Sequence, residues 1–291
     1  MKFKIDPKHD GMLVRDYLYH VRAFSRRMVK VIKYDEGILI NGSPVTVRAK
    51  VEAGDELRIQ FPAEERGRHL ASVHKPVSVL YEDDEVIILN KPPFLATIPS
   101  VHHLDDTLGN RLMGYYDHHG IPFTLHVVTR LDADTSGVVL VAKNRYVHSL
   151  LAKKQEEGEI HQTYQAVVEG HLETKKGTIN APIDRAPGSI IERRVDPKGK
   201  SAVTHYEVIE ETEETSLVHI RLETGRTHQI RVHFNDVGHS LCGDSLYGGI
   251  KKGINRQALH CNSIRFSHPI SGHEVYVEAP LPEDMENLII N

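Results

Sequence analysis

Two short polar stretches carry the side chains of this chain that are best suited to chemistry. The first places Arg130 two residues before Asp132, and Thr135-Ser136-Gly137 and a continuous apolar run follow. The second, nearly a hundred residues later, contains Arg226 and Arg231. A carboxylate in a loop can act as a nucleophile, a base or an electrostatic stabiliser, and a nearby arginine would favour its charged form and fix its orientation. The sequence therefore predicts an acid–arginine site that joins the two stretches.

The predicted elements around these stretches are mainly strands. Strands at 125–128 and 138–142 flank the Asp132 loop, and a helix is predicted from about Thr227 to Gly238, with free backbone N–H groups at 225–227 that would bind a phosphate. Further strands are expected at 85–90, 164–169, 202–209, 217–222, 259–266 and 274–278, with a helix at 146–157. Because helices are few and scattered, we expect an α+β fold with a mixed, mostly antiparallel sheet.

The first 62 residues read as a separate small module. Helical patterns span 11–20 and the stretch between the N-cap Ser25 and Gly37, where Met28, Val31 and Ile32 are expected to form the buried stripe. A hairpin with an Asn-Gly turn at 38–45 and a strand at 54–61 follow. The polar, aperiodic residues 63–75 read as a linker, so the expected domains are 1–62 and 76–291.

Composition excludes several classes of protein. No apolar run is long enough for a membrane span, and the start of the chain lacks an apolar signal core, so a cytoplasmic protein is expected. Two cysteines fit a reducing compartment. The 20 histidines lack zinc-ligand spacing, and neither a phosphate loop nor a dinucleotide fingerprint is present, so neither a metal nor an organic cofactor is expected.

The two polar stretches together resemble the catalytic motifs of the RluA-type pseudouridine synthases, which isomerise uridine within RNA. The resemblance implies that Asp132 is the catalytic carboxylate, that Arg231 is its salt-bridge partner and that Tyr164 lies at the flipped base. It also implies that Arg130 fills the gap that the flipped uridine leaves in the RNA. Thr129 stands where the family often has histidine, which leaves the Arg130–Asp132 pair intact.

Weaker expectations attach to other residues of these motifs. Arg226 and His228 are candidates for RNA or structural contacts, and Lys91, in a further family-like Asn-Lys-Pro motif, is expected to contribute structurally or electrostatically. Asp134 is expected only to bond backbone amides in the turn. Whether Asp132 acts as nucleophile or base stays open.

The small module resembles an S4-type RNA-binding module. Residues 1–33 contain nine Lys/Arg against three Asp, although the whole chain carries a net charge of −4. The resemblance implies contacts with RNA phosphates, which supply affinity without sequence choice. The residues expected to make them are Arg22, Arg26, Arg27 and Lys30.

These observations predict a cofactor-free, monomeric RNA pseudouridine synthase, with large-subunit ribosomal RNA as the expected substrate. Transfer RNA is the alternative substrate. A non-catalytic RNA-binding or ribosome-assembly protein is the alternative class, and a glycosidase-like hydrolase would need a second carboxylate, which neither motif offers.

Overall fold

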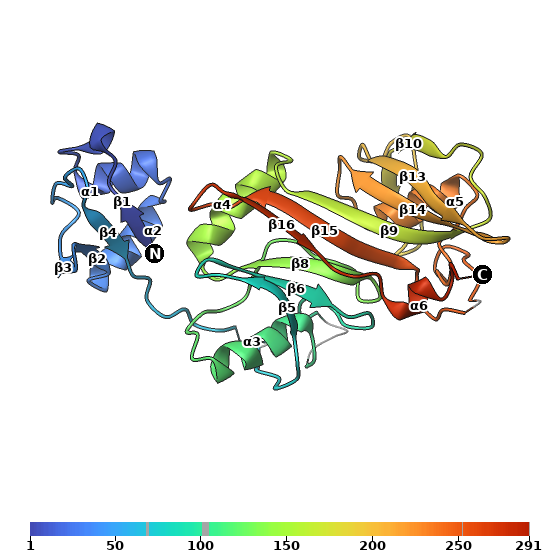
Figure 1. The fold of residues 1–291 in the computed structure, drawn as a ribbon, viewed down its shortest axis with the longest axis horizontal. Helices are drawn as coiled ribbons and strands as arrows, with labels where there is room; N and C mark the ends of the chain where they lie inside the picture. Colours follow the sequence, from blue (N-terminus) through green and yellow to red (C-terminus); the bar gives the residue numbers. More distant parts are fainter. Residues whose placement is uncertain (68–69, 101–104, 252, 291) are drawn as a thin grey trace.

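The chain forms two regions that are built on separate sheets (Figure 1). We call residues 1–62 the small region and residues 76–290 the large region. The residues that the computed structural model describes are 1–67, 70–100, 105–251 and 253–290. Residues 68–69 of the predicted linker lie outside the described residues.

The small region has a four-stranded antiparallel sheet in the order β1-β4-β2-β3. Its strands are β1 Lys2–Lys4, β2 Ile38–Ile40, β3 Ser43–Pro44 and β4 Glu56–Ile59. Its helical elements are the 3₁₀ helix Pro7–His9, α1 Val14–Asp16, the π-helical turn Tyr17–Val21 and α2 Arg26–Tyr34. The predicted hairpin is confirmed, because Asn41 and Gly42 take positive φ angles of 50° and 84° between β2 and β3.

Helix α2 begins at the predicted cap but buries a different stripe. The Ser25 side chain accepts a hydrogen bond from the Met28 N–H. Val29 and Ile32 are buried, whereas Val31 is 39% exposed, so the predicted stripe was wrong for Val31 and missed Val29. Residues three apart share a helix face, and with four apolar side chains in five positions only tertiary packing selects which face is buried.

The large region is built on one mixed sheet. The strand order is β10-β13-β14-β9-β15-β8-β6-β5, with β16 paired to β15 and β7 paired to β8. Only β15 and β8 pair in parallel among the pairs that the described residues form, which confirms the predicted α+β fold with a mostly antiparallel sheet. The strands are β5 Ser78–Glu82, β6 Val86–Lys91, β7 His126–Val127, β8 Ser136–Ala142, β9 His161–Glu169, β10 Lys176–Asn180, β13 Val203–Glu211, β14 Thr215–Leu222, β15 Leu259–Ser267 and β16 Glu274–Glu278.

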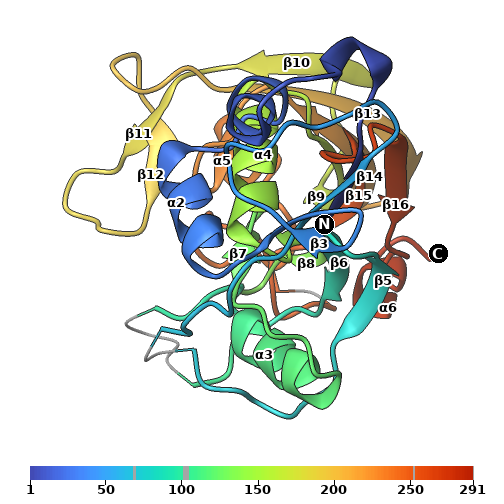
Figure 2. The same ribbon diagram turned by 90° about the vertical axis from the view of Figure 1, so that its left-hand side faces the viewer.

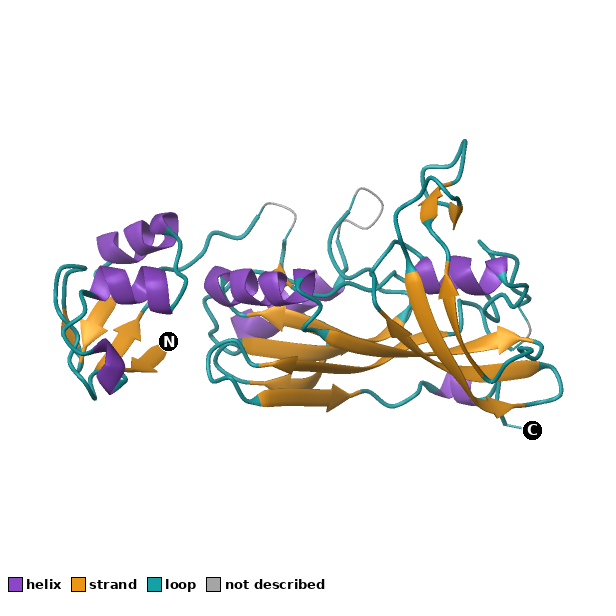
Figure 3. Ribbon diagram, turned by 90° about the horizontal axis from the view of Figure 1, so that it is seen from above, coloured by secondary structure: helices purple, strands orange, loops and turns teal. Residues whose placement is uncertain are grey.

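Four helices and a separate hairpin complete the described part of the large region. The helices are α3 Leu108–His118, α4 Arg145–Glu156, α5 Gln229–Asp236 and α6 Glu283–Glu286, and the hairpin pairs β11 Ile183–Arg185 with β12 Arg193–Val195. This hairpin projects from the side of the sheet where most helices lie (Figure 3). None of the helices described is long and apolar enough to cross a membrane.

Helix α3 was not predicted from the sequence. Its two glycines lower helix propensity, and a Cβ at Gly114 would lie 2.3 Å from the Val73 carbonyl oxygen. The backbone at residue 73 therefore passes directly against this helix, where only glycine fits. Thr107 supplies the N-cap, in a capping box with Asn110.

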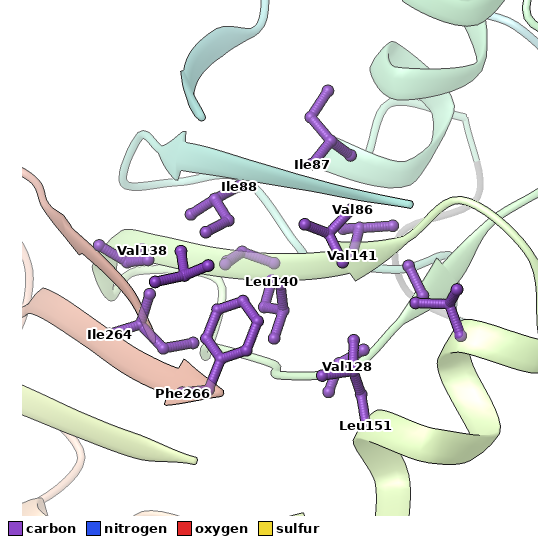
Figure 4. Packing of buried hydrophobic residues seen from close by; sticks show 14 of the residues in the cluster. Val86, Ile87, Ile88, Val128, Val138, Leu140, Val141, Leu151, Ile264 and Phe266 are labelled. Atoms are coloured by element: carbon purple, nitrogen blue, oxygen red, sulfur yellow. The ribbon is translucent and has the colours of Figure 1, made fainter. Parts of the chain in front are cut away.

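The core of the large region lies around the central strands (Figure 4). Every residue of β8 is buried, and β6 is buried from Val86 to Leu89. Strands covered on both faces carry continuous rather than alternating apolar residues. Each such side chain contributes roughly 1.5–3 kcal/mol of transfer free energy, so this core fixes the end of β8 from which the Asp132 loop leaves.

An aromatic contact joins the two regions, and an ionic contact joins the linker to the large region. Phe24 stacks on Tyr146 of α4 with ring centroids 3.9 Å apart, and the Tyr146 hydroxyl donates to the Arg22 carbonyl. Glu64 lies 2.8 Å from the His126 ring nitrogen. The end-on view in Figure 2 shows α4 behind the small region.

Candidate active site

Asp132 lies in the loop between β7 and β8, at the edge of the hydrophobic core. The Thr135 N–H donates to the Asp132 carbonyl at 3.1 Å, which closes the turn. At the start of β8, Gly137 has a φ of 113°, and a Cβ there would lie 2.1 Å from the Cys261 carbonyl oxygen. Only glycine fits at position 137, because β15 passes so close. The side chain of Asp132 is 38% exposed.

Arg231 on α5 links Asp132 to a second acid. Its Nη1 lies 3.4 Å from Asp132 Oδ2, whereas its Nε and Nη2 donate to Asp244 at 2.6 and 2.7 Å. Burial disfavours the charge of Arg231, but the bonds and charge of Asp244, and then the charge of Asp132, raise its pKa above the usual value. Arg231 is thus a permanent cation, anchored by Asp244 and presented to Asp132.

The role of Asp244 was not predicted from the sequence. Its side chain is 1% exposed and also accepts from the N–H groups of Leu246 and Tyr247. A Cβ at Gly249 would lie 2.0 Å from the Leu241 carbonyl oxygen, so the turn depends on glycine. The only sequence signal is the dense run of Gly, Asp and Tyr at 243–249, which indicates a constrained turn but not its partner.

Tyr164 on β9 lies in the same cleft as Asp132. It is 9% exposed, and burial, together with the neighbouring Cys261 thiol and Asp132, raises its pKa well above the usual value. A neutral phenol offers a ring face and a hydrogen-bond donor. A phenol that stays protonated is a poor proton acceptor, so its hydroxyl is suited to donate a hydrogen bond.

One cleft brings the predicted residues of the large region together. Asp132, Tyr164, Arg231, Arg130 and Arg226 all line a cleft of about 1020 Å³, at the upper end of the range of ligand sites. Asp132, Tyr164 and Arg231 also line a smaller pocket of about 100 Å³. Arg130 is exposed at this cleft.

The start of α5 differs from the prediction. The helix begins at Gln229 rather than near Thr227, and His228 before it has a positive φ of 58°. The Arg226 N–H donates to the Gln229 side chain at 3.0 Å, and the Arg226 Nε donates to the Ser201 carbonyl at 2.9 Å. The prediction of free N–H groups at 225–227 was therefore wrong for Arg226, because a side chain of the helix caps that position itself.

The predicted basic residues of the small region lie outside this cleft. Arg26, Arg27 and Lys30 are exposed on α2. Arg22 differs from them, because its Nε donates to the Tyr17 hydroxyl at 2.9 Å and its guanidinium lies 4.4 Å from the centroid of the Phe3 ring. These contacts within the small region occupy part of the Arg22 guanidinium, so less of it is free to bind RNA phosphates.

Lys91 is a buried cation beneath the Asp132 loop. Its ammonium donates to the carbonyls of Pro92, Leu95 and Ala133 at 3.0, 2.8 and 2.8 Å. Burial lowers its pKa to about 7, against raising contributions from the charges of Asp134 and Asp132. Lys91 ties the end of β6 to the loop.

One cluster with metal-ligand chemistry lies in the described residues, formed by Asp83, Glu85 and His268. His268 Nδ1 accepts from the N–H of Ile270 and of Ser271, and its Nε2 lies 3.2 Å from Asp83 Oδ2. The cluster therefore fits an internal histidine–aspartate pair.

Comparison with known proteins finds a matching family model and similar proteins. A family model described as "RNA pseudouridylate synthase" matches residues 85–236. An uncharacterised RNA pseudouridine synthase of Bacillus subtilis, YjbO, is 44% identical over 279 residues, which cover 96% of this chain and 98% of that protein. Ribosomal large subunit pseudouridine synthase D of Escherichia coli is 38% identical over 282 residues, covering 91% of this chain and 86% of the relative.

A solved structure shares the fold. Human RNA pseudouridylate synthase domain containing 1 superposes with a TM-score of 0.60 at 24% identity, covering 75% of this chain and 86% of that chain. At this identity the likeness concerns the fold alone.

Proposed function

The chain belongs to the RNA pseudouridylate synthase family, of the RluA type, and from this premise we propose that it isomerises specific uridines of large-subunit ribosomal RNA with Asp132 as the catalytic carboxylate. It is an enzyme, an isomerase acting on RNA. The observation that carries the proposed role of Asp132 is its half-exposed carboxylate beside the buried cation Arg231, in a cleft that also holds Tyr164.

The reaction breaks the C1′–N1 bond of uridine, turns the uracil and joins C1′ to C5, after which the C5 proton leaves and N1 gains a proton. Bond breaking builds positive charge on the ribose, as in glycoside hydrolysis. The Asp132 carboxylate stabilises this charge, attacks C1′ or removes a proton next to it, and each of these roles requires the ionised form. Arg231 fixes the carboxylate without moving, because Asp244 holds it from behind.

Two further groups complete the proposed site. Tyr164 stacks on the flipped uracil and offers a hydroxyl donor, consistent with its neutral, buried phenol. Arg130, exposed at the cleft, fills the space that the uridine leaves in the RNA.

Ribosomal RNA is our proposed substrate because the Escherichia coli relative is named for the large ribosomal subunit. Transfer RNA is the competing substrate. RNA shape around the uridine decides between them, so the two must be compared directly.

We propose domains at 1–62 and 76–291 joined by a linker at 63–75, with the small region as an S4-type module. Its exposed Arg26, Arg27 and Lys30 supply affinity for RNA phosphates, with a smaller share from Arg22. The four side chains at the centre of the site, Asp132, Tyr164, Arg231 and Asp244, come from one chain, which supports a monomeric enzyme. Both cysteines are free thiols, which supports a reducing cytoplasmic compartment.

The test is tritium release from transcripts labelled at uridine C5, run in parallel on large-subunit ribosomal RNA and on transfer RNA. Asp132→Ala is expected to lose about 1,000-fold or more of turnover, because it removes the reacting group. RNA binding, measured by fluorescence anisotropy, should stay close to wild type. Asp236→Ala, an exposed acid at the end of α5, is the matched control and should retain wild-type turnover.

Two results would contradict the proposal. Turnover retained by Asp132→Ala would refute the role of Asp132. An absence of tritium release by the wild-type protein from both RNAs would refute both substrates and favour a role in RNA binding without catalysis.

A further inference from the structure

His228 is a partly buried residue beside Asp132 to which neither the family description nor the proposed mechanism assigns a role. Its Nε2 lies 3.7 Å from Asp132 Oδ2, and its side chain is 11% exposed. The other charged groups that face the ring are Arg231 on α5, Arg193 on β12 and Asp244. A neutral histidine carries hydrogen on only one of its two ring nitrogens. The choice decides whether Asp132 faces an N–H donor or a nitrogen that carries no hydrogen.

The Tyr247 hydroxyl determines that choice. It accepts a hydrogen bond from the Arg193 N–H at 2.9 Å, and it lies 2.9 Å from His228 Nδ1. Among the described residues, Nδ1 is the one acceptor within hydrogen-bond distance of this hydroxyl, so we assign the hydroxyl hydrogen to Nδ1. Nδ1 is then the acceptor, and a neutral imidazole in this position carries its hydrogen on Nε2.

The neutral form is the one that the surroundings favour. Burial lowers the pKa of His228, and the positive charges of Arg231 and Arg193 lower it further, against the raising effects of Asp132 and Asp244. The result is a neutral N–H group that lies 3.7 Å from Asp132 Oδ2, slightly farther than a hydrogen bond. Arg231 Nη1 contacts the same oxygen at 3.4 Å.

Both N–H groups therefore lie beside the same oxygen of the carboxylate, Arg231 Nη1 at 3.4 Å and His228 Nε2 at 3.7 Å. Within the described residues, no hydrogen bond or ion pair reaches Oδ1. An orientation held through Oδ2 leaves Oδ1 turned to the cleft, and a neutral donor does so without cancelling the negative charge that the reaction needs.

We propose that His228 is a positioning residue: its Nε2–H, fixed by Tyr247, closes to hydrogen-bond distance of Asp132 Oδ2 when uridine binds and holds that oxygen so that Oδ1 faces the ribose. The link through the Arg193 N–H also ties this orientation to the β11–β12 hairpin, whose loop residue Ile191 lines the cleft. The inference rests on the proposed role of Asp132.

Three substitutions at one position separate this role from a structural one. The amide of glutamine reaches the place of Nε2, whereas the amide of asparagine reaches only that of Nδ1. In the tritium-release assay on large-subunit ribosomal RNA, His228→Ala is expected to lower kcat about 10- to 30-fold. His228→Gln should stay within about threefold of wild type, since a donor is restored. KM should change little for either variant.

His228→Asn is the control for backbone conformation and for the Tyr247 contact. Asparagine tolerates the positive φ of 58° best and can still accept from Tyr247. We expect it to be as slow as His228→Ala. Asparagine retaining more activity than glutamine, or His228→Ala turning over like wild type, would overturn the inference.

The tautomer is measured independently of turnover. In ¹⁵N-histidine-labelled protein, with the signal of His228 identified by its loss in His228→Gln, the wild type should show the Nε2–H form at neutral pH, and Tyr247→Phe should show a mixture. A wild-type ring that is protonated on Nδ1 would overturn the inference. Turnover in Asp132→Ala would refute the proposed role of Asp132 and this inference with it. Wild-type turnover in His228→Ala, alongside an inactive Asp132→Ala, would refute this inference alone.

Discussion

The cleft and the small region both contain arginines, but the environments of these arginines differ: Arg231 in the cleft is buried and paired, whereas Arg26 and Arg27 of the small region are exposed. In the cleft, the side chain of Arg231 is 8% exposed and bound by two short hydrogen bonds to Asp244. On α2, Arg26 and Arg27 are exposed and form no ion pair with any described residue. A fixed guanidinium defines the position of one carboxylate, whereas free guanidinium groups attract phosphates over a range of positions.

The difference also concerns free energy. Two buried charges cost several kcal/mol each to desolvate, so Arg231–Asp244 adds little net stability, and losing one partner leaves a buried charge alone. Exposed arginines incur no such cost. The buried pair in the cleft therefore fixes the position of Arg231 but adds little stability. The exposed arginines of the small region can bind RNA phosphates without a desolvation penalty.

The largest expected effect comes from breaking the buried pair. Asp244→Asn leaves Arg231 without a counter-charge and should lower the free energy of unfolding by about 3–5 kcal/mol. Turnover should fall about 100-fold, because Arg231 no longer holds its place beside Asp132. Denaturant unfolding and tritium release measure the two effects.

The matched control is an exposed pair. Arg265 and Glu274 are 3.8 Å apart, with side chains 52% and 66% exposed. Arg265→Ala should change stability by less than about 1 kcal/mol. Equal effects for the two substitutions would show that burial does not distinguish them.

A second prediction concerns the buried cation Lys91. Its pKa is lowered from the usual 10.5 to about 7 in the folded protein. Between these pH values the Lys91 amine binds more protons in the unfolded chain than in the folded protein, so the contribution of Lys91 to stability should rise as the pH increases from about 7 to 10. Lys91→Met should abolish this rise and cost roughly 1–3 kcal/mol at pH 7, because three carbonyls lose their donor.

Denaturant midpoints measured at several pH values test this prediction. Lys176→Met, an exposed lysine on β10, is the control and should leave the pH dependence unchanged. A stability profile of Lys91→Met parallel to that of wild type would contradict the titration of Lys91 in this range.

The smallest expected effect concerns the free charges of α2. Arg26→Ala combined with Arg27→Ala should weaken RNA binding and reduce the slope of log affinity against log salt by about 1.5, because two phosphate contacts are lost. Stability and kcat should stay unchanged, since these side chains are exposed. A fall in kcat at saturating RNA would show that the small region takes part in more than binding.

Local patterns predicted much of the molecule. The Ser25 cap, the Asn41-Gly42 turn and the apolar run of β8 depend on neighbours in sequence, and each was predicted from it. The contact between Asp132 and Arg231 was expected from a family resemblance. Helix α3 and the buried stripe of α2 were missed or misassigned, because each depends on which surface packs against it.

The sequence by itself determined the chemistry available to this protein: an acid in a loop before a buried strand, arginines in a second motif and an excess of basic residues in the small region. Only the tertiary structure decided that Asp244 anchors Arg231, that Tyr247 contacts His228 and that Arg231 and His228 both lie beside Oδ2 of Asp132. The physical reason is that covalent order fixes local conformation and residue type, whereas the partners of a buried charge come from distant segments that meet only when the core packs.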